Sequence, residues 1–148
     1  MACKLISASI AAAAVAAMLA VSGPAFAASA VDGMTSTLSA TPAAFRGRCP
    51  AVITFNGTIT VTGKIDPDDP VQIGYQFLRS DNATGPISYY TITEPGTQAV
   101  SDTWTLGGAP LPNYSGWEQL KAWPTGHEGG FGYSFSGNAN FSVRCTRR

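Results

Sequence analysis

Histidine is almost absent from the chain, because His127 is the single histidine among 148 residues. A serine or cysteine nucleophile activated by histidine would have to use that residue, and no G-x-S-x-G motif is present. A tight zinc site needs several histidine or cysteine ligands at close spacing, and His127 beside Glu128 supplies too few. We therefore interpret His127 as a solvated loop residue and expect no catalytic residue, no metal and no cofactor.

Charged residues are also scarce, at 12% of the chain, with nine basic and nine acidic side chains. Lys4 is the one charged residue before position 28, so residues 28–148 carry eight basic and nine acidic side chains. No basic patch points to a nucleic acid, and no apolar run after residue 27 is long enough to span a membrane. We expect neither a nucleic-acid partner nor a membrane span in residues 28–148.

The long apolar run of the sequence lies at its start. Leu5 to Val21 is uncharged, follows Lys4, and leads through Gly23-Pro24 to Ala25-Phe26-Ala27, which has small residues where signal peptidase requires them. We predict that residues 1–27 are a cleaved signal peptide and that residues 28–148 form one domain, secreted or held in the periplasm or cell envelope. A retained membrane anchor is the alternative, but a run of about 17 residues is short for one.

Cysteine is limited to three positions, and Cys3 is removed with the predicted leader. The remaining pair, Cys49 and Cys145, is predicted to form a disulfide, because an exported chain meets an oxidising compartment. Two reduced thiols are the alternative. A bridge that closes a loop of this size contributes about 4–5 kcal/mol in the chain-entropy treatment.

Helical periodicity is missing, whereas alternation of apolar and polar residues recurs along the chain. The clearest case starts at Cys49, where Ile53, Phe55 and Ile59 share one apolar row and Thr54, Thr58 and Thr60 belong to the other. Strands are predicted at residues 34–40, 49–61, 71–79, 87–93, 97–106, 116–123 and 132–145, with residues 28–33 as a loose lead.

About seven antiparallel strands in one domain predict an all-β fold, namely a sandwich of the immunoglobulin or fibronectin-III type. A β-barrel is the alternative. If successive strands alternate in direction, Cys49 at the start of the second strand and Cys145 at the end of the seventh lie at the same end of the domain. Both also belong to apolar rows, so the topology is compatible with the bridge.

Acidic residues offer two weak candidates for chemistry. Asp66, Asp68 and Asp69 could present oxygens to calcium, but the prolines among them favour a solvated turn. A glycoside hydrolase needs two carboxylates that face each other across a cleft, and the sequence does not pair its candidates. Those candidates are Glu94, Asp102, Glu118 and Glu128.

Aromatic residues gather in the second half of the chain. We predict that Trp104 and Trp117 fill the core, whereas Trp123 and Tyr114 lie near strand ends and form the candidate surface pair for ligand contact. Several aromatic side chains exposed on one sheet face could stack on sugar rings or pack on a partner protein. The remaining candidates for such a face are Tyr89, Tyr90, Phe131 and Tyr133.

Several segments together resemble small exported bacterial proteins that have an immunoglobulin-like sandwich and no assigned function. The resemblance covers nearly all of residues 28–148 and implies the fold and export, but no catalytic residue and no known partner. The segments are Cys49-Pro50 before Ile53-Thr54-Phe55-Asn56-Gly57-Thr58-Ile59, then Tyr75-Gln76-Phe77-Leu78-Arg79-Ser80-Asp81, Gly96-Thr97-Gln98-Ala99-Val100, Trp104, Gly116-Trp117 and Ala139-Asn140-Phe141-Ser142-Val143-Arg144-Cys145.

These observations favour a monomeric, non-catalytic binding or structural module that contacts a protein or a glycan at the cell surface through its loops or one sheet face. The alternatives are a small secreted hydrolase, an inhibitor of a secreted enzyme, and a purely structural surface protein. An ordered row of exposed aromatic residues would favour glycan binding. A concave pocket with two facing carboxylates would favour an enzyme, and a smooth polar surface would favour the structural role.

Overall fold

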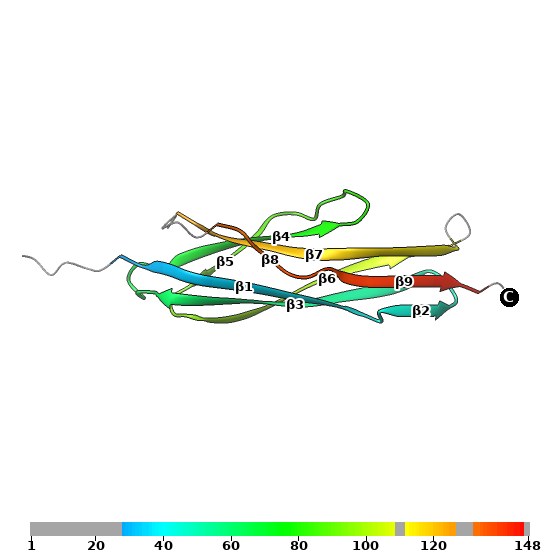
Figure 1. Ribbon diagram of the computed structural model, residues 1–148, viewed down its shortest axis with the longest axis horizontal. Coiled ribbons are helices and arrows are strands. Elements are labelled where there is room, and N and C mark those ends of the chain that lie inside the picture. Colours follow the sequence, from blue (N-terminus) through cyan, green and yellow to red (C-terminus); the bar gives the residue numbers. More distant parts are fainter. Residues whose placement is uncertain (1–27, 109–111, 127–131, 147–148) are drawn as a thin grey trace, which may run out of the picture.

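The computed structural model describes residues 28–108, 112–126 and 132–146, and within these ranges the chain forms nine β-strands and no helix (Figure 1). The strands are β1 (Ala30–Thr41), β2 (Ala44–Gly47), β3 (Ala51–Lys64), β4 (Val71–Arg79), β5 (Ser88–Ile92), β6 (Gly96–Leu106), β7 (Asn113–Thr125), β8 (Ser134–Phe135) and β9 (Ala139–Cys145). The predicted signal peptide and the predicted loop residue His127 lie outside the described residues.

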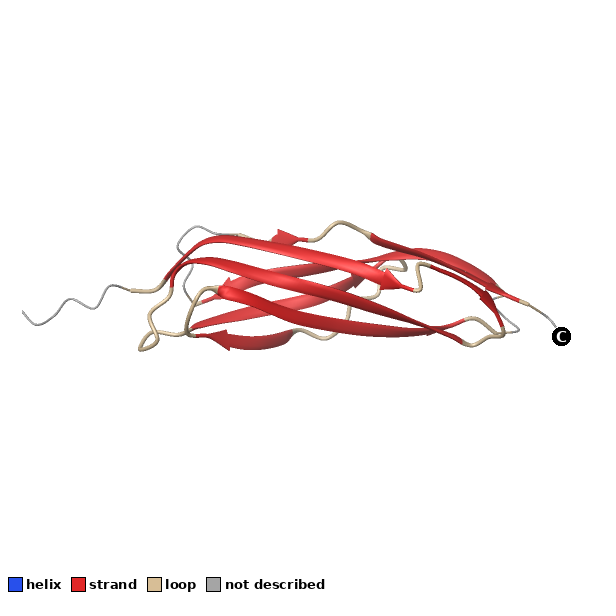
Figure 2. Ribbon diagram, turned by 90° about the horizontal axis from the view of Figure 1, so that it is seen from below, coloured by secondary structure: helices blue, strands red, loops and turns tan. Residues whose placement is uncertain are grey.

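The strands form two sheets whose strands run along the long axis of the molecule in both views (Figures 1 and 2). One sheet has the order β1-β3-β6, and the other has the order β2-β9-β7-β4-β5 with β8 beside β7. The predicted all-β fold is therefore confirmed as two sheets packed into a sandwich. None of the described segments forms a helix that is long and apolar enough to cross a membrane.

The core lies between the sheets and is built by the predicted apolar rows. Ile53, Phe55 and Ile59 of β3 are each fully buried, as the alternation of that segment predicts. The buried residues separate into two clusters along the sandwich. One cluster contains Ile59, Val71, Ile73, Phe77 and Leu120, and the other contains Ile53, Phe55, Trp104, Phe141 and Val143.

The predicted disulfide is present between Cys49 and Cys145, whose Cα atoms are 5.4 Å apart. Cys49 precedes β3 in the three-stranded sheet and Cys145 ends β9 in the other, so the bridge joins the two sheets at one end. Gly107 lies against the bridge, because a Cβ atom at this position would be 2.5 Å from the sulfur of Cys49. The chain therefore needs a glycine beside the disulfide.

The N-terminal part of the domain differs from the prediction. Residues 28–33 are not a loose lead, since β1 begins at Ala30 and Val31 belongs to the core. After β1 the chain passes to the other sheet, where β2 pairs with β9 in parallel. The expectation that all strands are antiparallel is wrong for β2. After the chain crosses between the sheets, β2 joins the open edge of β9 and runs in the same direction as β9.

The last predicted strand, residues 132–145, is divided into β8 and β9. Residues 136–138 lie opposite only two residues of β7, between the pairs Lys121–Phe135 and Glu118–Ala139. The extra residue is a bulge, and it reverses which side chains face the core. Ser134 and Ser136 are consequently buried and Phe135 faces outward, whereas Ala139 and Phe141 face inward.

Candidate functional site

The predicted surface pair, Trp123 and Tyr114, is not brought together. Both residues are on β7, but nine positions separate them and they face opposite sides of the sheet. Tyr114 faces inward and its ring packs 5.8 Å from that of Phe141 in the core. Trp123 faces outward, so it retains its role as a candidate ligand contact and Tyr114 does not.

Trp123 belongs instead to a group of aromatic residues on the outer face of the six-stranded sheet, which we call the aromatic patch and define as Tyr89, Trp123, Tyr133 and Phe135. Gly74 pairs with Tyr89 on one side and with Trp123 on the other, so these two side chains share the outer face. The Trp123 ring lies 5.8 Å from that of Tyr133, which lies 6.3 Å from that of Phe135. Tyr89, Tyr133 and Phe135 are 54%, 60% and 50% exposed.

Trp123 is held flat on the sheet by the absence of a side chain at Gly74. A Cβ atom at Gly74 would be 2.6 to 2.8 Å from three atoms of the indole, so one face of the ring packs on the backbone of β4. The opposite face of the ring is turned away from the sheet. Such an arrangement gives a flat apolar surface at a fixed position without burying the ring in the core.

Lys121 lies among the rings of the aromatic patch. Its Nζ is 3.7 Å from the centroid of the Tyr133 ring, 5.4 Å from Trp123 and 6.0 Å from Phe135. These distances are those of cation–π contacts, which hold an ammonium group over the face of a ring. The aromatic patch therefore carries one positive charge at its centre.

The two tryptophans that were predicted to fill the core have different environments. Trp104 is in the core as predicted, at 3% exposure, and packs 5.4 Å from Phe55 and 5.1 Å from Phe141. Trp117 is not in the core, and the prediction is wrong for it. It lies on the outward row of β7 with Trp123, because the inward row of this strand is occupied by Glu118, Leu120 and Ala122.

Glu118 is the most unusual residue of the interior. It is fully buried, and neither carboxylate oxygen has a hydrogen-bond partner. Burial, and to a lesser degree the nearby Asp102 carboxylate, raise the pKa of Glu118 to about 8, whereas Trp104 and Arg79 act in the opposite direction. The Trp104 indole N–H is close enough to lower this pKa, although the pair does not reach hydrogen-bond geometry. Glu118 therefore holds a proton at neutral pH.

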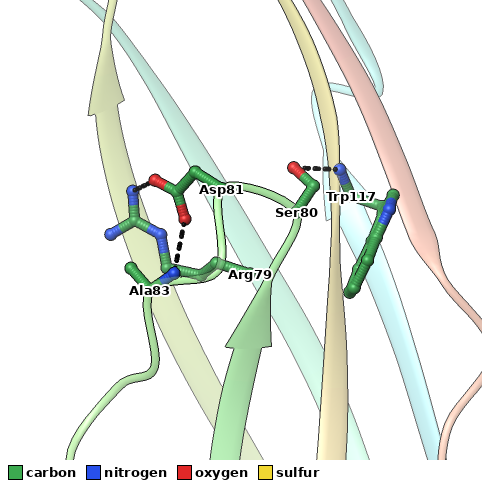
Figure 3. Close-up of polar contacts among 5 residues, drawn as sticks. All are labelled: Arg79, Ser80, Asp81, Ala83 and Trp117. Carbon is green, nitrogen blue, oxygen red and sulfur yellow. Dashed lines mark hydrogen bonds and ion pairs between the residues drawn. The ribbon is translucent and has the colours of Figure 1, made fainter.

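Arg79, at the end of β4, lies beside Glu118 and Trp104 in this polar part of the interior. Its Cζ lies 3.8 Å from the centroid of the Trp104 ring, and its Nη2 donates to Asp81 at 2.9 Å. Figure 3 shows how the following loop is fixed, since Asp81 also accepts from the Ala83 N–H and Ser80 Oγ accepts from the Trp117 N–H. The loop thus holds Arg79 and positions the backbone of β7 at Trp117.

Of the four carboxylates considered for hydrolysis, the structure brings Asp102 and Glu118 into one neighbourhood. Glu94 lies in the turn between β5 and β6, and Glu128 lies outside the described residues. A hollow of about 390 Å³ lies nearby, between β3, β4 and β6. Its lining contains no carboxylate; the lining residues are Asn56, Gly57, Tyr75, Ala99, Val100 and Ser101.

The aspartates considered for calcium form a turn, as favoured from the sequence. The Asp69 N–H donates to the Asp66 carbonyl at 3.0 Å, and the Asp68 N–H donates to the Asp66 carboxylate at 3.0 Å. Within residues 28–108, 112–126 and 132–146, no group of three or more histidine, cysteine or acidic side chains is placed to hold a metal ion.

Two members of the candidate site were missed from the sequence, namely Phe135 and Lys121. Phe135 shares its odd number with the inward residues Ala139, Phe141 and Val143, and the bulge that reverses its direction leaves no trace in the alternation. Lys121 is flanked by polar and apolar residues like many surface lysines. The spacing Lys121-x-Trp123 was the available signal, because these two residues must share a face of any strand.

No family model matches this chain, and no curated protein matches it. The solved structures that are similar to this chain include two with low identity. One is a Pseudomonas fluorescens alkylpurine DNA glycosylase bound to DNA that contains an abasic-site analogue, with 14% identity, a TM-score of 0.46, and coverage of 75% of this chain and 30% of that chain. The other is a CARDB domain from Pyrococcus furiosus in complex with di-metal ions, with 10% identity, a TM-score of 0.49, and coverage of 77% and 94%.

Proposed function

We propose that this protein is an exported, non-catalytic binding module of the immunoglobulin-like type and that it binds a polysaccharide through the aromatic patch. The single observation that supports the proposal most is the gathering of Trp123 with the exposed rings of Tyr89, Tyr133 and Phe135 on one sheet face. Solvent-exposed aromatic side chains gathered on one face mark an interaction site more often than chance packing. A sugar ring has an apolar C–H face that stacks on an aromatic ring and hydroxyl groups at its edge.

Polar side chains beside the rings fit the hydroxyl groups of such a ligand. Gln76 and Gln119 lie on the outer face next to Lys121, and their amide nitrogens donate to the carbonyls of Gly85 and Ser136 at 2.9 Å each. These bonds fix both amides near the rings before any ligand arrives, which lowers the entropy cost of binding.

The strand order supports the immunoglobulin-like assignment. The order β1-β3-β6 corresponds to strands A, B and E of that fold, and β9-β7-β4-β5 corresponds to G, F, C and C′. The short β2 follows β1 along the chain and pairs with β9 in the other sheet. Together, β1 and β2 then correspond to a strand A that is divided between the two sheets. Export is proposed from the leader sequence and is supported by the Cys49–Cys145 bridge, because disulfides persist in oxidising compartments.

The hydrolase alternative has one observation in its favour, which is the neighbourhood of Asp102 and the protonated Glu118. A retaining or inverting glycosidase uses two carboxyl groups on either side of the scissile bond. Glu118 is fully buried, however, so a substrate cannot reach its oxygens while the sandwich is intact. We therefore propose the binding role and assign Glu118 to the interior.

A polysaccharide-binding assay with matched variants tests the proposal. The protein is applied to a glycan array and to insoluble polysaccharides, and the bound fraction is compared for the wild type, Trp123→Ala, Tyr133→Ala and Val52→Ala. Val52 is 56% exposed but lies on the other sheet, so it serves as the control. We expect retention of the wild type and of Val52→Ala and a loss of at least tenfold for the two aromatic variants. Equal retention of all four proteins, or of none, would contradict the proposal.

A further inference from the structure

The outer face of the six-stranded sheet has a one-sided charge distribution. The six strands contain a single acidic residue, Glu118, and it faces the core. The charged side chains that face outward from these strands are Lys121, Arg46 and Arg144, all of which are basic. This bias contrasts with the near balance of acidic and basic residues in the whole chain.

Arg46 and Arg144 form a second basic position at the other end of this face. They are directly paired in the parallel ladder between β2 and β9, and both side chains are exposed. Two like charges at paired positions of a sheet repel each other. Neither arginine makes a salt bridge within the described residues, where Arg79–Asp81 is the ion pair found. An anionic group placed between the two guanidinium groups would remove that repulsion and accept hydrogen bonds from both.

A continuous track of outward side chains connects the arginine pair to the aromatic patch. Arg144 pairs with Asn113 of β7, and Trp123 follows ten residues later on the same strand. At ~3.4 Å per residue the two ends of the track are ~34 Å apart, which is a length that a chain of several sugars can span. Trp117 lies between them on the same row and pairs with Asn140, so the middle of the track also offers an aromatic ring.

We infer that the ligand of this face is a linear polysaccharide with carboxylate groups, which runs along β7 from the aromatic patch to the Arg46–Arg144 pair. This inference rests on the proposed function and adds the charge of the ligand and the second contact. The aromatic rings stack on sugars near Lys121, and a carboxylate further along the chain binds between the two arginines. Isolated basic positions and a near-zero total charge suit a ligand of moderate charge density rather than a polyphosphate.

The test compares polygalacturonate oligomers with the same oligomers after methyl esterification, which removes the charge and keeps the sugar backbone. Affinities are measured by titration calorimetry for the wild type, for the double variant Arg46→Gln/Arg144→Gln, and for Lys64→Gln. Lys64 is an exposed lysine at the end of β3 in the other sheet, so Lys64→Gln is the control for loss of a positive charge away from the proposed track. We expect at least tenfold weaker binding after esterification and a similar loss for the arginine variant with the acidic oligomer. Lys64→Gln should bind as the wild type does.

The failures of the two proposals are distinguishable. Equal affinity for the acidic and esterified oligomers, with loss of both in Trp123→Ala, would overturn the inference and leave a neutral glycan as the ligand. Tighter binding to a single-stranded oligonucleotide of matched length, or to vesicles of anionic phospholipid, would overturn it in favour of a phosphate-bearing ligand. Absence of binding to both oligomers and to every glycan of the array would overturn the inference and the proposed function together.

Discussion

At the scale of single residues, Glu118 is a polar position in an otherwise apolar row. Leu120 and Ala122 follow it on the inward side of β7 and are fully buried, as Glu118 is. The carboxyl group lies where the two core clusters meet, beside Arg79, Asp102 and Trp104. A buried carboxyl group without hydrogen bonds is tolerated when it is protonated, because the neutral form costs far less to desolvate than the ion.

This environment makes stability dependent on pH. The pKa of Glu118 is raised from 4.5 to about 8, so the folded protein binds more protons than the unfolded chain between these values. The contribution of protonated Glu118 to the free energy of unfolding is complete below about pH 4.5, and it is lost as the pH rises towards 8. Glu118→Gln should remove this dependence and be more stable than the wild type at pH 8, by about 2 to 4 kcal/mol.

Urea unfolding at pH 5 and pH 8 measures this difference. Asp32→Asn, at an exposed position of β1, is the control and should follow the wild type at both values. If the wild type and Glu118→Gln lost the same free energy of unfolding between pH 5 and pH 8, Glu118 would not be the buried acid described above.

Gly74 acts at the same scale through the indole that covers it. Gly74→Ala should displace Trp123 from the sheet, because the new Cβ would overlap the ring. We expect weaker polysaccharide binding, by about the tenfold that corresponds to 1.4 kcal/mol. Gly132→Ala is the control, since a Cβ atom there would meet nothing within 4 Å. Calorimetric titration checks both variants, and unchanged affinity in Gly74→Ala would argue against Trp123 as a ligand contact.

At the scale of elements, the sequence predicts strands well where one face is buried and the other is solvated. The alternation in β3 and β4 locates those strands to within a few residues, since Ile53, Ile59 and Ile73 face the core as expected. The strand at β7 is also found, but Trp117 was assigned to the core because sandwiches usually hold a large aromatic residue there, and its row in β7 faces outward. The parallel partner of β2 is also invisible in the sequence, because four residues give no pattern and the pairing is set by the rest of the fold.

The bulge between β8 and β9 contains Ser136, whose hydrogen bonds connect it to β7. Its buried Oγ accepts the Leu120 N–H at 2.9 Å and donates to the Gly137 carbonyl at 2.8 Å. Ser136→Ala should leave the Leu120 N–H without a partner and cost about 1–3 kcal/mol of stability. Thermal and urea unfolding measure the loss, with Ser115→Ala, an exposed position of β7, as the control. A loss no greater than that of the control would show that the bulge does not depend on this side chain.

At the scale of the whole molecule, the disulfide holds the two sheets together at one end. It spans 96 positions of sequence and joins the start of β3 to the end of β9. The same end carries Arg144, the residue before Cys145, and so the far part of the proposed ligand track. The prediction of the bridge from sequence succeeded because the predicted leader, the two remaining cysteines and the strand directions all agreed. The proposed ligand track could not be found in the same way, because it depends on the pairing of β2 with β9.

Removal of the bridge should therefore affect stability more than binding at the aromatic patch. The double variant Cys49→Ser/Cys145→Ser is expected to lose about 4–5 kcal/mol, since a long loop is released in the unfolded chain. At temperatures where it remains folded it should still bind the ligand through Trp123. Denaturant unfolding with and without reducing agent checks the first part, and a wild type that is insensitive to reduction would contradict it.

The most direct test of the central claim is a nuclear magnetic resonance titration of the isotope-labelled protein with oligogalacturonate. Binding along β7 predicts that the residues whose amide signals shift belong to β2, β5, β7, β8 and β9 and lie next to the aromatic patch, Lys121 and the Arg46–Arg144 pair. Signals of the three-stranded sheet and of the hollow beside Tyr75 should stay in place. Shifts confined to that hollow or to the outer face of β1-β3-β6, or no shifts at saturating ligand, would contradict the claim.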